Sequence, residues 1–322
     1  RQGYYYGDAQ KGGGEIMERL LVVSSSPHIH APLETDKIMM WVLIALAPAG
    51  LAGVYFLGLR CALVMAVCVA ASVISEKVWQ ARAGRKDTTR DLSAAVTGLL
   101  LAYNLPPAIP YWMAAVGSVF AIIIVKQFFG GIGCNIVNPA LAARAMMLTS
   151  WPVPMTTWTV QGVSGATPLA MIKGGFGTLP PISDLIIGNV GGCIGETSAA
   201  ALLLGFAILL AKDIIKWHIP VVYVVTAAAL SAAFGRPAFY EIFAGGLFLG
   251  AIFMATDYTT SPMTVKGQIV FAVGCGFLTA LIRTFGGYPE GVSYSILIMN
   301  LTVPLIDKAL RPHIFGEVKK RG

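Results

Sequence analysis

The chain has 322 residues, a formal net charge of +7, 56% apolar residues and only 12% charged residues, with a mean hydropathy of +0.71. An average soluble domain carries roughly 25% charged residues, so this composition excludes a soluble enzyme, a nucleic-acid-binding domain and a disordered chain. There is no glycine period and no heptad charge pattern, which excludes collagen and coiled coil. The composition predicts an all-α polytopic membrane protein. The five cysteines show no metal-binding or disulfide spacing, so no metal site is expected.

Ten apolar segments are expected to form about ten transmembrane helices. In chain order they are 39–58, 61–76, 92–105, 111–129, 138–150, 196–211, 219–235, 239–256, 267–284 and 292–307. Several of them are shorter than the roughly 20 residues that a straight span needs, and 92–105 and 138–150 are the clearest cases. Such lengths favour broken or half helices whose ends lie inside the protein.

The basic residues predict the orientation of these spans. With residues 1–37 in the cytoplasm, most of the 23 basic residues fall on the cytoplasmic side, as the positive-inside rule requires. Residues 38–308 then form the transmembrane domain and residues 309–322 a basic cytoplasmic tail. A natural start at Met17 would make residues 1–16 an upstream extension. The predicted location is the cell (inner) membrane, with many passes and both termini in the cytoplasm.

Arg144 falls inside the segment 138–150. A charged side chain within a span is costly and is normally functional or paired. Asp184 and Glu196 are its expected partners.

Two pairs of segments resemble each other and suggest an internal repeat. Asp91-Leu-Ser-Ala-Ala resembles Glu196-Thr-Ser-Ala-Ala, and Thr167-Pro with Lys173-Gly resembles Ser261-Pro with Lys266-Gly. An acid and a serine at a helix start satisfy free backbone N–H groups. The two members of each pair have opposite predicted orientations, which is typical of inverted-topology repeats. Chance similarity in apolar sequence of low diversity is the alternative.

One connection, 151–195, is long, rich in Pro, Gly, Thr and Trp, and predicted to lie on the extracytoplasmic face. Long connections in compact proteins are usually functional or disordered, and the tryptophans and prolines favour an ordered one. It contains Ser164-Gly165-Ala166-Thr167, which taken alone is a turn sequence.

Ser164–Thr167 resembles the flavinylation motif of one family of redox pump proteins. This family comprises RnfD of the Rnf ferredoxin:NAD oxidoreductases and NqrB of the Na⁺-translocating NADH:quinone oxidoreductases. Further matches follow along the chain, at Ser24–His28, Tyr103–Pro107, Gly130–Ala140, Met254–Asp257 and Thr260–Pro262. The compact chain and its Ser-Ser-Ser-Pro-His start are closer to the Rnf pattern. Cys134 departs from the family pattern, in which that position is more often polar.

The resemblance implies a covalent FMN, joined by a phosphoester bond to the Thr167 hydroxyl. The small residues Ser164, Gly165 and Ala166 would give a flavin transferase access to that hydroxyl. A non-covalent riboflavin is a further implication. Asp257, Thr260 and Ser261 are its candidate binding residues on the cytoplasmic side, although Asp257 could equally be a solvated loop acid.

Asn135 and Asn138 are candidates for lining a pocket at membrane depth, where broken helices are tolerated if they line a cavity. Helix punctuation is the alternative, with Asn138 as a cap and Pro139 as the first helical residue.

The function implied is that of a membrane subunit of a ferredoxin:NAD⁺ oxidoreductase that relays electrons through FMN and is coupled to Na⁺ or H⁺ translocation. Thr167 would be an attachment point, so no catalytic side chain is expected. The implied partners are the flavoprotein RnfG, the membrane proteins RnfA and RnfE, the NAD-side protein RnfC, the iron–sulfur protein RnfB, the flavin transferase and membrane lipid, with no nucleic acid. Two alternatives stay open: the NqrB protein of the quinone reductase, and a secondary transporter or channel without a cofactor.

Overall fold

The computed structural model describes residues 34–85, 87–160, 163–175 and 179–311. The chain divides between Glu34 and Thr35 into two units, and the helices described here belong to the second. The expected extension at 1–16, the Ser24–His28 motif and most of the basic tail lie outside the described residues.

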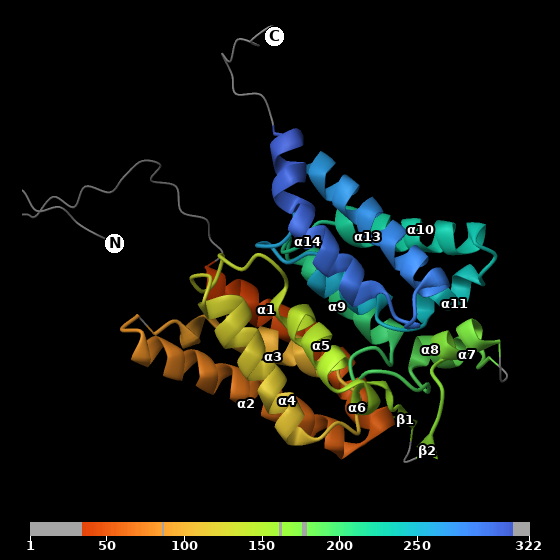
Figure 1. The fold of residues 1–322 in the computed structure, drawn as a ribbon, viewed down its shortest axis with the longest axis horizontal. Coiled ribbons are helices and arrows are strands. Elements are labelled where there is room, and N and C mark those ends of the chain that lie inside the picture. Colours follow the sequence, from red (N-terminus) through yellow and green to blue (C-terminus); the bar gives the residue numbers. More distant parts are fainter. Residues whose placement is uncertain (1–33, 86, 161–162, 176–178, 312–322) are drawn as a thin grey trace, which may run out of the picture. The chain divides into compact units, whose positions relative to one another are not determined.

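The expected all-helical architecture is confirmed, and helices occupy the ten apolar segments (Figure 1). Their bounds are α1 Thr35–Leu57, α2 Leu59–Arg82, α3 Ser93–Tyr103, α4 Tyr111–Phe120 continued by the π-helix η2 Ala121–Gln127, α5 Pro139–Ser150, α9 Ala199–Ala211, α10 His218–Ala233, α13 Val265–Phe285 and α14 Val292–Ala309, with 239–256 divided as described below. By length and composition, α1, α2 and α13 are each able to cross a membrane. Four of the others, namely α3, α4 with η2, α9 and α10, are shorter apolar helices.

The two short segments are short helices with polar ends inside the protein. Helix α5 has 12 residues and is therefore about 18 Å long, well below the roughly 30 Å of a bilayer core. It begins where the Asn138 side-chain oxygen accepts hydrogen bonds from the backbone N–H groups of Ala140 and Leu141. Helix α3 has 11 residues and ends at the buried Asn104, whose amide donates to the carbonyl of Leu100.

The segment 239–256, expected to be one span, is broken, which corrects that prediction. It consists of α11 Ala238–Phe243, α12 Leu247–Leu249 and the π-helix η3 Gly250–Met254. Gly245 at the break has a φ of +70°, a conformation that favours glycine. At Gly246 a Cβ atom would overlap the carboxylate of Glu196. The side chain of Glu196 therefore occupies the space beside the break.

The connection 151–195 is ordered in its described residues and carries several short elements. These are α6 Pro152–Thr156, the antiparallel strands β1 Thr159–Val160 and β2 Val163–Ser164, α7 Pro168–Gly174 and α8 Ile182–Ile187. Helices α7 and α8 both contact α11, so this connection packs against the broken segment.

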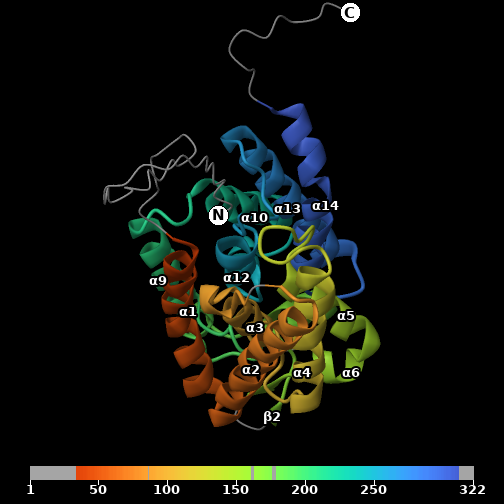
Figure 2. The ribbon, with the colours of Figure 1, turned by 90° about the vertical axis from the view of Figure 1, so that its left-hand side faces the viewer.

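The long helices pack in two groups (Figure 1). Helix α2 packs against α3 and α4, and α5 contacts α3, α4 and η2. In the other group, α13 packs between α10 and α14. Helix α1 lies beside α9 and helix α5 contacts α14, and these two contacts join the groups (Figure 2). Most buried core residues form one apolar cluster that runs through both groups, and Leu169, Leu185 and Ala244 form a second, smaller one.

The sequence echoes that suggested a repeat have different local roles. Asp91 accepts hydrogen bonds from the backbone N–H and hydroxyl of Ser93, the first residue of α3, at 2.9 and 2.6 Å, although the N-cap position itself is Leu92. At α9 the capping residue is Ser198, whereas Glu196 is turned towards Arg144. Thr167 caps α7, but Thr264 rather than Ser261 caps α13. The inverted repeat stays a prediction.

Candidate functional site

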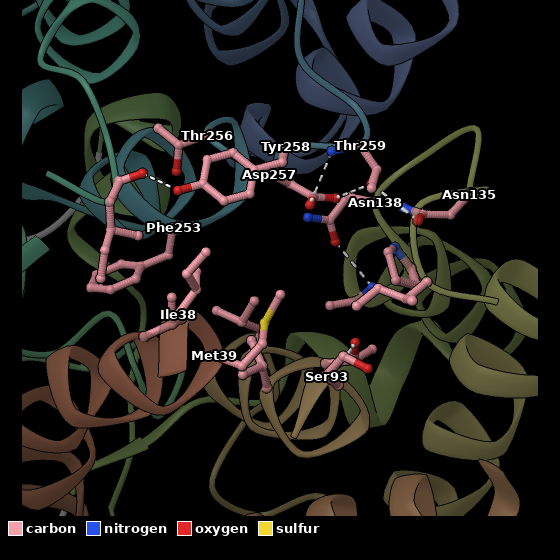
Figure 3. A pocket seen from close by; sticks show the side chains of 18 of the residues that line it. Ile38, Met39, Ser93, Asn135, Asn138, Phe253, Thr256, Asp257, Tyr258 and Thr259 are labelled. Carbon is pink, nitrogen blue, oxygen red and sulfur yellow. Dashed lines mark hydrogen bonds between the residues drawn. The ribbon is translucent and has the colours of Figure 1, made fainter. Parts of the chain in front are cut away.

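A cavity of about 310 Å³ lies between α1, α3, the start of α5 and the residues that follow η3 (Figure 3). This volume is at the lower end of the range of pockets that take small molecules. Its walls are largely apolar, with Ile38 and Met39 from α1 facing Phe253 from η3. Polar side chains gather on the side formed by residues 135–138 and 256–259. The cavity therefore combines an apolar slot with a polar edge.

The polar edge brings together two groups of candidates that the sequence placed separately. Asn135, Asn138 and Asp257 all line the cavity. The hydroxyl oxygen of Thr259 lies 3.0 Å from both Asn135 Oδ1 and Asp257 Oδ2, so it joins the loop before α5 to the loop after η3. Asn138 donates from its side chain to the carbonyl of Met254 at 3.3 Å. Both expected roles of Asn138, helix cap and cavity lining, are thus found together.

Thr260 and Ser261 lie outside the set of described residues that line the cavity. Thr260 is buried and its hydroxyl donates to Asp257 Oδ2 at 3.2 Å, so it supports the carboxylate from behind. Asp257 is only half-buried, yet desolvation raises the pKa of its carboxyl above the ordinary value, and the hydrogen bonds from Thr259 and Thr260 partly oppose that shift.

A buried ion pair that the sequence did not reveal borders the same cavity. Lys126 is one of the basic residues expected on the cytoplasmic side, and it is 3% exposed and lines the cavity. Its ammonium lies 2.9 Å from Glu76 Oε1 and 2.6 Å from the Ser93 hydroxyl. Gln127 donates to the same Glu76 oxygen at 2.6 Å. The sequence contained an indication of this ion pair, because Lys126 and Gln127 fall inside the apolar segment 111–129, where a charged side chain needs a partner.

A second buried charge cluster surrounds Arg144. Its guanidinium is ion-paired with Glu196 Oε1, at 3.4 Å, and with Glu290 Oε2. Glu196 is thus confirmed as a partner, Glu290 was missed, and Asp184 is not among the described residues that bind the guanidinium. Arg144 also donates to Asn104 Oδ1 at 2.9 Å and to the hydroxyl of Ser293 at 3.1 Å.

Thr167 lies next to this cluster. It lines a small cavity together with Glu196 and Glu290. Its side chain is buried, and its hydroxyl oxygen accepts a hydrogen bond from the backbone N–H of Ala170 at 3.2 Å, which caps α7. Gly165 is exposed and Ala166 is half-buried. Ser164 belongs to β2, and its side chain lies outside the described residues.

The two cavities are at different depths along the helices. In α14, Ser293 reaches the Arg144 cluster, while Asn300, seven residues later, donates to the carbonyl of Thr260 beside the larger cavity. Seven residues of α-helix rise about 10 Å. Thr167 and Asp257 therefore belong to two separate sites. Glu196, beside Thr167, comes just before the start of α9, whereas Leu209 near the end of α9 lines the larger cavity.

Residues 22–316 match the protein-family model described as the NQR2, RnfD, RnfE family. The chain belongs to this family. It is 50% identical over 306 residues, 93% of this chain and 96% of the relative, to the D subunit of the Na⁺-translocating ferredoxin:NAD⁺ oxidoreductase complex of Acetobacterium woodii. It is 45% identical to the D subunit of the proton-translocating ferredoxin:NAD⁺ oxidoreductase complex of Clostridium ljungdahlii, with 94% and 98% of the two chains covered. The D subunit of the ion-translocating oxidoreductase complex of Stutzerimonas stutzeri is 36% identical, with 87% and 92% covered. The resemblance inferred from the short motifs is confirmed.

Proposed function

We propose that this chain is the RnfD protein of an ion-translocating ferredoxin:NAD⁺ oxidoreductase, through which electrons pass by way of bound flavin. The observation that carries the proposal is that two relatives, each covered over more than nine tenths of its length, are named as the D subunit of such a complex. These names favour the Rnf type over the quinone reductase. One relative is named for Na⁺ and the other for protons, so the proposal covers either ion.

The proposed partners are the other proteins of such a complex. They are the flavoprotein RnfG, the membrane proteins RnfA and RnfE, the NAD-side protein RnfC and the iron–sulfur protein RnfB. This sequence has no Gly-rich dinucleotide fingerprint and no iron–sulfur set of cysteines, which supports placing ferredoxin and NAD on the partner proteins. The proposed location is the cell (inner) membrane with both termini in the cytoplasm, supported by the distribution of basic residues.

A covalent FMN on Thr167 is the central part of the proposal. A phosphoester from the Thr167 hydroxyl would tether the flavin at one fixed depth, and the flavin itself supplies one- and two-electron chemistry. The exposed Gly165 just before Thr167 supports access by a flavin transferase. The hydroxyl that would be modified is buried and caps α7. Attachment therefore requires the first turn of α7 to release its cap, at a cost of about 1 kcal/mol.

The larger cavity is the proposed site of the non-covalent riboflavin. Its apolar walls suit the flat ring system, and Asn135, Asn138 and Asp257 offer donors and acceptors for the polar edge of a flavin. The 310 Å³ cavity and Thr167 lie near opposite ends of α9. Two flavins in these places would shorten the distance that an electron must cross between the faces of the protein.

The test of the covalent flavin is Thr167→Ala in a host that has the flavin transferase. We expect the added FMN mass and the in-gel flavin fluorescence of the intact chain to disappear, while the protein still inserts. Thr156→Ala is the matched control, because Thr156 is an exposed threonine of the same connection. Fluorescence that survives Thr167→Ala refutes the attachment site. An unmodified wild-type chain from such a host favours a transporter or channel without a cofactor.

The test of the riboflavin site is Val42→Trp, which fills the cavity from α1. Leu51→Trp is the control, since Leu51 is 72% exposed on the same helix. We expect extractable riboflavin to co-purify with the wild type and with Leu51→Trp, and to be lost from Val42→Trp. Equal riboflavin in all three proteins would place it elsewhere.

A further inference from the structure

The cluster around Arg144 has one positive charge and two negative charges. The side chains of Arg144, Glu196 and Glu290 are 7%, 1% and 17% exposed. One guanidinium offsets only one of the two carboxylates when both are ionised. An unbalanced charge at such burial is costly, so buried charges are normally paired. Among these three side chains, one carboxylate charge is therefore not offset when all are ionised.

One buried oxygen of this cluster has no partner within the described part of the chain. Glu196 Oε1 faces Arg144, but Glu196 Oε2 is buried and has no hydrogen-bond partner among the described residues. A buried polar atom without a partner costs free energy unless an ion, a proton or a water meets it. Carboxylate oxygens of Glu196 and Glu290 and the Cys193 sulfur all lie within 4.8 Å of one another. The Cys193 thiol donates to the carbonyl of Asn104, at 3.3 Å. Each carboxylate binds Arg144 through one oxygen, so the second oxygens of Glu196 and Glu290 are the available ligands.

The cavity beside Glu196 has room for one small ion or one water molecule. The cavity lined by Thr167, Glu196 and Glu290 has about 10 Å³ of free volume, close to that needed by a single water molecule. The glycine at position 246 makes room for the Glu196 carboxylate, because any Cβ there would overlap it. The backbone at Gly246 thus leaves room for the Glu196 carboxylate.

We propose that Glu196 and Glu290 together hold one monovalent cation, either a proton or Na⁺, next to Thr167. One added positive charge brings Arg144 and the two carboxylates to neutrality, whereas a divalent ion would leave an excess. Oxygen ligands suit a hard cation such as Na⁺. The other charged or titratable groups facing Glu196 are Arg144, Cys193 and Arg283. Arg283 shares the Glu241 carboxylate with Arg236, so its positive charge also acts on Glu196 and further disfavours a divalent ion.

This inference deepens the proposed function and rests on it only for its coupling role. A cation held beside Thr167 would balance the negative charge that a flavin attached there gains on reduction. The cation site itself needs no flavin, because all its ligands belong to this chain. It can therefore be tested in Thr167→Ala as well as in the wild type, and failure of the flavin assignment is distinguishable from failure of the cation site.

The experiment is carbodiimide labelling of the purified complex in Na⁺-free medium, mapped by mass spectrometry of peptides. Carbodiimides modify carboxyl groups that carry a proton in an apolar environment. We expect labelling at Glu196 or Glu290 in the wild type and in Thr167→Ala. The internal control is Glu241, which is buried but bound by Arg236 and Arg283 and is expected to stay unlabelled.

The conditions separate the two cations. If the site takes Na⁺, adding NaCl at constant pH suppresses the labelling and KCl does not. If it takes only protons, labelling falls as the pH rises and is the same in NaCl and KCl. Infrared spectroscopy supplies a readout that does not depend on carbodiimide access: a carboxylic-acid carbonyl band in Na⁺-free wild type that Glu196→Gln alters. No labelling at any pH, together with no such band, would mean that the cavity holds only water and would overturn the proposal.

Discussion

Replacing Arg144 with Met tests whether this arginine stabilises the protein through its ion pairs with two buried carboxylates. The substitution removes both ion pairs, to Glu196 and Glu290, and the hydrogen bond of 2.9 Å to Asn104. Breaking a buried ion pair by deleting one partner costs about 3–5 kcal/mol. We expect the free energy of unfolding to fall by this amount, which is more than a hundredfold in the unfolding equilibrium. Denaturant titration of the purified protein in mixed micelles measures it.

A control and a combined variant show whether charge imbalance is the cause. Arg60 is an exposed arginine that donates to the backbone carbonyl of Ala108, and Arg60→Met is expected to change stability by about 0.5 kcal/mol or less. Adding Glu196→Gln and Glu290→Gln to Arg144→Met removes the stranded charges, so the triple variant should be more stable than Arg144→Met alone. If the triple variant is equally or less stable, the lost free energy came from packing and the electrostatic reasoning is refuted.

Two further substitutions test the space and the charges at the two sites. Gly246→Ala should lower the free energy of unfolding by roughly 1–3 kcal/mol, because its Cβ would displace the Glu196 carboxylate. Gly287→Ala is the control and should change stability little, because a Cβ there meets nothing within 4 Å. Equal losses of stability in the two variants would contradict the predicted clash with Glu196. Lys126→Met should cost about 3–5 kcal/mol, because it leaves Glu76 buried without its cation. In Lys126→Met, adding Glu76→Gln should recover stability, and a further loss would show that the lysine acts by packing alone.

Apolar periodicity and length predicted most of the helices, because a chain in lipid must satisfy its backbone within helices. The short lengths of 92–105 and 138–150 indicated helices that end inside the protein, and α3 and α5 do so. The break in 239–256 was not predicted. The side chain of Glu196, more than 40 residues away in sequence, occupies the space beside Gly246 at this break. A local pattern cannot reveal a contact of that kind.

The candidate residues were predicted better than their arrangement. Asn135, Asn138 and Asp257 were chosen from separate motifs, and their shared cavity became visible only when α5 and η3 were placed together. Glu290 was missed because it lies in a glycine-rich connection, where an acid is normally solvated. Its partner Arg144 was recognised because a charge inside an apolar segment needs compensation.

The short and broken helices have a common consequence for the interior. Because α3 ends at Asn104, α5 begins at Asn138 and η3 ends at Met254, polar ends meet in the middle of the protein instead of at its faces. The Asn138 amide donates to the Met254 carbonyl at 3.3 Å, and the Asn104 amide lies 3.6 Å from the Met254 sulfur. Asn104 Oδ1 in turn accepts from Arg144.

These contacts form a continuous buried polar line from the larger cavity to the Glu196–Glu290 cluster. An uninterrupted apolar span would have separated the two sites by several turns of lipid-like side chains. We therefore expect a change of charge at either site to act on the other through Asn138, Met254, Asn104 and Arg144, with the amide of Asn104 as the central link. Asn104→Leu keeps the approximate volume but removes the link, so it should weaken any effect of the larger cavity's occupancy on carbodiimide labelling at Glu196. If labelling at Glu196 depends on riboflavin in Asn104→Leu as it does in the wild type, these contacts carry no coupling between the two sites.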